Sequence, residues 1–116
     1  MTQAQLGTLA RRWIKKLRLN APAWKSIDVS FGTLEEMGNT VGKCEWSTEH
    51  RTALVRILEE PDHGEACSDT IEQTLVHELL HLVLQGYMTR PQKYDSNFEH
   101  GLNVLSEVLA PTKKRK

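Results

Sequence analysis

The sequence has little of what marks secreted and membrane proteins. Only 2 of its 116 residues are cysteine, whereas small secreted folds commonly depend on several disulfides, so we expect Cys44 and Cys67 to be reduced thiols of a cytoplasmic protein. The longest nearly apolar stretch, Leu79 to Leu84, is broken by His81 and is far shorter than the roughly 20 residues that cross a bilayer. The first residues, MTQAQLGTLARRWIKKLRL, are basic where a signal peptide needs an apolar core. These absences predict neither a membrane span nor a secretion signal.

The chain also lacks an excess of charge of either sign. Its 15 lysines and arginines balance its 15 aspartates and glutamates, which gives no general attraction to nucleic acid or to an anionic membrane. Basic residues gather in the first helix and at the end of the chain, so nucleic-acid binding is kept only as an alternative. A hydrophobic fraction of 39% is enough for one core. We therefore expect a single domain over residues 1–112 and a basic tail over residues 113–116.

Hydrophobic periodicity predicts an α+β fold. Apolar positions three to four apart indicate helices, and alternating apolar positions indicate short strands, as where Ala53, Val55 and Ile57 share one face. The expected order is a helix, three strands and two further helices, at residues 2–19, 24–31, 41–47, 51–58, 69–85 and 96–109. The three tryptophans are expected to pack in or beside the core.

Three finer expectations concern the second half of the chain. Residues 59–68 are polar and rich in turn formers, so we predict a loop there, with His63 at the surface. Ser68 or Asp69 is the expected N-cap of the following helix, and Gly86 its end. The last helix is expected to bury an apolar stripe formed by Leu102, Leu105, Val108 and Leu109.

The main chemical signal is the run His77-Glu78-Leu79-Leu80-His81, which has the H-E-x-x-H pattern of zinc-dependent hydrolases. Residues four apart lie one above the other on a helix, so both imidazoles can reach one metal ion. Glu78 is rotated by about 100° from His77, beside the metal rather than on it. There it can take a proton from a water that zinc has acidified. The alternative is that these are ordinary polar residues of an amphipathic helix, although burying them without partners is costly.

A catalytic zinc site needs a third protein ligand. The downstream side chains able to supply it are Asp95, Glu99, His100 and Glu107. We favour Glu99, because Asn103 lies one turn further along the same helix face and could orient a ligand histidine through its second ring nitrogen. His100 is the alternative, although Val104, one turn further on from it, offers no such help.

Two segments, VHELLHLVLQG and FEHGLNVLSEVLA, together resemble the minimal zinc metallopeptidases of phages and mobile elements, gluzincin-like relatives of the ImmA/IrrE group. The resemblance implies a zincin-like minimal metalloprotease fold, with Zn²⁺ held by His77, His81 and Glu99. It implies that Glu78 is the general base. It also implies that the strand before the metal helix, residues 51–58, is the sheet edge that pairs with an extended substrate.

The segment Glu99-His100-Gly101 also resembles the SprT-like proteases, whose third ligand is a histidine beside a glycine, so His100 stays open. The predicted function is hydrolysis of peptide bonds in a peptide or protein substrate by a metal-activated water. The alternative is a metal-stabilised binding or regulatory protein with little or no protease activity. Candidate donors for stabilising an oxyanion are Tyr94, His63 and Arg90.

Overall fold

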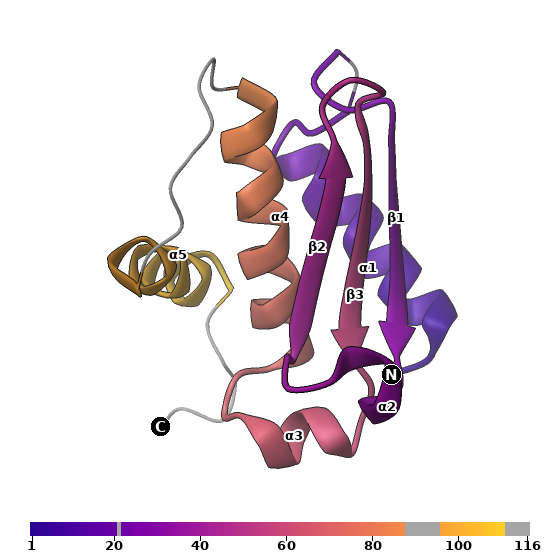
Figure 1. Ribbon diagram of the computed structural model, residues 1–116, viewed down its shortest axis with the longest axis vertical. Coiled ribbons are helices and arrows are strands. Elements are labelled where there is room, and N and C mark those ends of the chain that lie inside the picture. Colours follow the sequence, from indigo (N-terminus) through magenta and orange to yellow (C-terminus); the bar gives the residue numbers. More distant parts are fainter. Residues whose placement is uncertain (21, 88–95, 111–116) are drawn as a thin grey trace.

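The protein has an α+β fold in the computed structural model, which describes residues 1–20, 22–87 and 96–110. Within these ranges it contains five helices and one three-stranded sheet (Figure 1). In chain order the elements are α1 (Gln3–Lys16), β1 (Ser26–Gly32), α2 (Leu34–Met37), β2 (Gly42–Ser47), β3 (Thr52–Leu58), α3 (Asp62–Ala66), α4 (Ile71–Tyr87) and α5 (Ser96–Leu109). The expected order of a leading helix, three strands and two long helices is confirmed. No helix in the described part of the chain is long and apolar enough to cross a membrane.

The sheet is mixed, with the strand order β1-β3-β2. The central strand β3 pairs in parallel with β1 and antiparallel with β2. The expectation that residues 51–58 form a sheet edge is therefore wrong, because β3 is hydrogen-bonded to a neighbour on each side. The buried side chains of Ala53, Val55 and Ile57 place this strand over the middle of the core. The edge strand nearest α4 is β2 (Figure 1).

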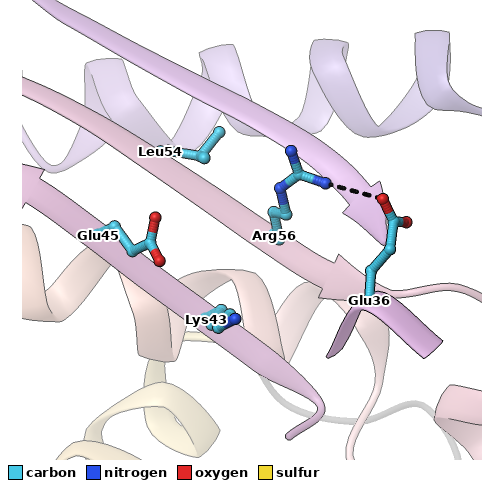
Figure 2. A pocket seen from close by; sticks show the side chains of 5 residues that line it. All are labelled: Glu36, Lys43, Glu45, Leu54 and Arg56. Carbon is cyan, nitrogen blue, oxygen red and sulfur yellow. Dashed lines mark ion pairs between the residues drawn. The ribbon is translucent and has the colours of Figure 1, made fainter. Parts of the chain in front are cut away.

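The long helices cover only one face of the sheet. On that side α1 packs against β1, and α4 packs against β2 and β3. Figure 2 shows the other face, where Lys43, Glu45, Leu54 and Arg56 surround a hollow of about 340 Å³ that Glu36 of α2 also lines. The exposed ion pair between Arg56 and Glu36, at 3.6 Å, contributes little to stability in water. This charged face is solvated, and the side chains of the H-E-x-x-H run lie on the opposite side of the sheet.

Two tryptophans hold α4 in place within the core. Trp13 of α1 donates from Nε1 to Glu72 Oε2 at 2.6 Å, and Trp24 donates from Nε1 to the backbone carbonyl of Leu82 at 3.0 Å. Both tryptophan side chains are buried, as predicted. Because a buried donor left without an acceptor would be destabilising, these bonds restrict where α4 can sit against α1 and the segment before β1.

Thr70 caps the first turn of α4, whereas Ser68 or Asp69 was expected to do so. Its Oγ1 accepts from the backbone N–H of Gln73 at 3.1 Å, and its own N–H donates to Gln73 Oε1 at 3.0 Å. This reciprocal pair is a capping box, and its Thr-x-x-Gln pattern is present in the sequence. The helix also continues past Gly86 to Tyr87.

The stretch expected to be a loop contains the short helix α3, and His63 within it is fully buried rather than at the surface. Its Nε2 lies 2.7 Å from Thr74 Oγ1, and its Nδ1 lies 3.4 Å from Glu60 Oε1. These polar neighbours offset the cost of burying an imidazole. The bond to Thr74 connects α3 to the first turn of α4.

The buried face of α5 differs from the expected apolar stripe. Leu102 is buried, but the other three residues of the predicted stripe are exposed: Leu105, Val108 and Leu109. Ser106 and Ala110 are buried in their place. The helix is turned in this way because Glu99 and Asn103 form polar contacts with α4.

Candidate metal centre

Two histidines of α4 and one glutamate of α5 converge in the structure. His77 Nε2 lies 2.9 Å from Glu99 Oε1, and His81 Nε2 lies 3.4 Å from Glu99 Oε2. One ligand atom from each of the three residues lies within 4.8 Å of the other two, and no other such group of three occurs among the residues that the structure describes. The imidazole centroids are 5.3 Å apart, as expected for residues one helical turn apart. The cluster can therefore hold a single metal ion.

Two of the other candidate ligands, His100 and Glu107, lie apart from this cluster. His100 follows Glu99 on α5 but has an exposed side chain, and Glu107 is exposed near the far end of the same helix. Asp95 lies outside the described residues. Glu99 of α5 is thus the described carboxylate that faces both histidines, because α5 packs against α4.

The two ring nitrogens of His77 have different partners, Asn103 and Glu99. The contact with Asn103 indicates which nitrogen carries the proton. Its Nδ1 lies 2.8 Å from Asn103 Oδ1, which can only accept, so Nδ1 carries the proton. In the neutral imidazole, Nε2 then directs a lone pair at the Glu99 carboxylate, 2.9 Å away. Two acceptors at this distance need either a proton or a metal ion between them. The donor set and this arrangement fit a bound cation.

His81 is also prepared for ligation. Burial lowers its pKa, although the Glu99 carboxylate acts in the opposite direction, so the neutral imidazole that a metal requires is favoured. Trp46 of β2 stacks on the His81 ring, with centroids 6.4 Å apart and an interplanar angle of 20°. This stacking restricts rotation of the imidazole and leaves Nε2 directed at Glu99.

Glu78 lies beside the cluster, between α4 and β2. Its side chain is largely buried, and the residue is 8% exposed. Burial raises its pKa to about 7, with Glu99 also raising it and His77 lowering it. On the same face of β2, burial and the nearby Glu78 carboxylate both raise the pKa of Cys44. Cys44 therefore stays a protonated thiol, which is not the form that binds metal.

A cavity of about 300 Å³ opens onto the cluster. It is lined by Asn39, Thr40, Val41, Gly42, Asp69, Thr74, His77, Glu78, Glu99 and Asn103. The lining brings Glu78 and two of the three residues of the cluster, His77 and Glu99, to one solvent-accessible space. Of the three oxyanion donors considered from sequence, His63 is buried against Thr74 and does not line this cavity. The other two, Tyr94 and Arg90, lie outside the described residues.

Sequence reasoning missed the contribution of β2 to this site. Trp46 was expected only to pack, and Gly42, although it belongs to a segment (Gly42-Lys43-Cys44) that fits the metallopeptidase resemblance loosely, was given no role at the site. The stacking of Trp46 on His81 and the position of Gly42 in the cavity lining both depend on β2 being the edge strand beside α4. No local sequence pattern specifies that arrangement. A glycine inside a strand is the one available signal, since it often marks a close approach of another group.

Comparison of the chain with models of known protein families, with curated proteins and with solved structures gives no match. The interpretation of this site therefore depends on the geometry and chemistry of its own residues.

Proposed function

We propose that the protein is a zinc-dependent metallopeptidase with a zincin-like fold. The observation that supports this proposal is the convergence of His77, His81 and Glu99, with the carboxylate of Glu78 beside them on a shared cavity. Two histidines and one glutamate are a recurrent ligand set of catalytic zinc sites, which leave a further position open. Structural zinc sites usually have four protein ligands, so a set of three favours a catalytic role.

In this proposal Zn²⁺ is held by His77, His81 and Glu99, and when bound it acidifies water and polarises the scissile carbonyl. Glu78 accepts the proton of the attacking water and passes it to the nitrogen of the leaving amine. Asn103 keeps the proton of His77 on Nδ1, so that Nε2 remains available as a ligand. Trp46 limits rotation of the second imidazole.

The edge strand β2 supports an extended peptide as the substrate class. Leu58 donates its N–H to the carbonyl of Val41 at 2.9 Å, which identifies this as a hydrogen-bonded pair of the antiparallel ladder. Bonded and non-bonded pairs alternate along such a ladder. Gly42 and Cys44 therefore direct their backbone groups away from β3, where a peptide strand can add.

The function is tested by incubating zinc-loaded protein with a complex peptide library and identifying new termini by mass spectrometry. We expect cleavage by the wild type and loss of cleavage by at least about 100-fold in Glu78→Gln, because general-base catalysis contributes about that much or more. Zinc content should be unchanged in the variant, since Glu78 is not a ligand. Equal cleavage by both preparations would refute the assigned base, and no cleavage by the zinc-loaded wild type would refute the peptidase.

A metal-stabilised binding protein is the second candidate. It is favoured by the exposed apolar residues of α5, which have no evident role in hydrolysis: Val104, Leu105, Val108 and Leu109. Exposed apolar surface of this kind is typical of interaction sites. Zinc binding without any cleavage is the outcome that would support this candidate.

Neither cysteine forms a disulfide, which fits the cytoplasmic location we propose.

A further inference from the structure

The backbone of β2 approaches α4 closely at Gly42. A Cβ built on this residue would lie 2.7 Å from Glu78 Oε2 and 3.1 Å from Glu78 Cδ. It would also lie 2.8 Å from Thr74 Cγ2, one turn earlier on the same face of α4. The distances of 2.7 Å to Glu78 Oε2 and 2.8 Å to Thr74 Cγ2 are shorter than real Cβ contacts. Any side chain at position 42 must therefore displace its neighbours.

The glycine is not required by the backbone conformation. Among the described glycines only Gly38 has a positive φ, at 63°. Gly42 pairs regularly with Ile57 in the ladder of β2 and β3. Position 42 favours glycine because Glu78 and Thr74 of α4 leave no room there for a Cβ.

We propose that Gly42 is a positioning residue, whose missing side chain leaves the space in which the Glu78 carboxylate lies beside the metal ligands. The two neighbours of a new Cβ would respond differently. Thr74 is β-branched, lies on a helix and bonds His63 through Oγ1, so it has little freedom to move. The Glu78 carboxylate is at the end of a flexible side chain and is the group that gives way. A methyl group at position 42 therefore moves the carboxylate out of place, and the three heavy atoms nearest to it belong to Glu78 and Thr74 rather than to His77, His81 or Glu99.

The contact is tested first without metal or activity. The side-chain ¹³Cδ resonance of Glu78, assigned by its loss in Glu78→Gln, is compared in wild type, Gly42→Ala and Gly32→Ala. Gly32→Ala is a matched control, because Gly32 belongs to β1 and its Cβ would lie 2.8 Å from Met37 Sδ of α2. We expect the resonance to shift in Gly42→Ala and not in Gly32→Ala. An unchanged resonance in Gly42→Ala would overturn the inference.

The catalytic consequence rests on the proposed peptidase function. On any substrate that the wild type cleaves, Gly42→Ala should lower kcat at least about tenfold, as expected for a misplaced general base. Bound zinc, KM and the kcat of Gly32→Ala should be unchanged. Combining Gly42→Ala with Glu78→Asp, which withdraws the carboxylate by one methylene, should lower kcat by less than the product of the two single effects. Wild-type kcat in Gly42→Ala, or losses that simply multiply, would overturn the positioning role.

The resonance comparison and the kinetic comparison together distinguish failure of this inference from failure of the proposed peptidase function. If the wild type cleaves nothing, the resonance comparison still decides whether Gly42 positions Glu78. If Gly42→Ala does not fold, the variant Gly42→Ala/Thr74→Ser removes the stiff methyl contact and keeps the hydroxyl that bonds His63. The shift of the Glu78 resonance is then expected in that double variant relative to Thr74→Ser alone, and its absence there would overturn the inference.

Discussion

At the residue scale, the candidate metal centre depends on a few side chains whose orientation is set by one neighbour each. Asn103 determines which nitrogen of His77 faces Glu99, and Trp46 limits rotation of His81. Such outer contacts matter because a ligand histidine that must first change tautomer or rotate binds its metal more weakly.

Replacing Asn103 with alanine should weaken zinc binding by about 10–100-fold, the usual effect of losing the partner of a ligand histidine. Asn103→Asp keeps an acceptor at the same place and should bind zinc at least as tightly as the wild type. Dissociation constants measured by competition with a zinc chelator would check both. Equal affinity of the alanine variant and the wild type would show that the bond to His77 plays no part in metal binding.

The sequence predicts which residues share one face of a helix better than it predicts contacts between different elements. The spacing of His77 and His81, and of Glu99 and Asn103, follows from the helical repeat and can be found without a structure. The burial of His63 depends on the approach of another element, which no local pattern contains. The same reason explains why the close contact between Gly42 and Glu78 was not anticipated.

At the scale of elements, periodicity correctly predicts the three strands and the three long helices, but it misses the short helices α2 and α3 and does not give the arrangement of the elements. β3 has the alternation expected of any strand with one buried face, and that alternation is the same for a central and an edge strand. The stripe predicted for α5 failed because polar contacts with α4, rather than the most apolar face, determine how the helix is turned.

The start of α4 gives a prediction at this scale. Thr70→Ala should destabilise the protein by about 1 kcal/mol, because it removes the capping bond to the Gln73 N–H. Ser68→Ala and Asp69→Ala, at the two positions that the sequence first indicated, should change the free energy of unfolding by less than about 0.5 kcal/mol. Urea denaturation of the metal-free proteins would measure all three. A larger loss in either control than in Thr70→Ala would contradict the assigned cap.

At the scale of the whole molecule, the candidate metal centre joins two parts of unequal burial. The sheet, α1 and α4 share the main core, whereas α5 packs chiefly against α4 and exposes several apolar residues (Figure 1). A metal held by both α4 and α5 would therefore stabilise the position of α5 in particular.

Hydrogen exchange can test this coupling between metal binding and the fold. At a free zinc concentration of about 100 times Kd, binding adds about 2.7 kcal/mol, so amide exchange across residues 96–109 should slow by up to about 100-fold. Exchange in β3, in the core, should change less. The protection should disappear in Glu99→Ala, which cannot link the two helices. Equal protection of α5 by zinc in Glu99→Ala and in wild type would contradict the coupling.

The central claim is that His77, His81 and Glu99 form a zinc site, and bound metal tests it most directly. Elemental analysis should be made on wild type, Glu99→Ala and His100→Ala, each purified without added metal. The account predicts about one zinc per chain in wild type and in His100→Ala, and a strong loss in Glu99→Ala, because three protein ligands hold a catalytic zinc. Loss of zinc only in His100→Ala would move the third ligand to the neighbouring residue. A folded wild type that carries no zinc and takes up none when it is added would contradict the account altogether.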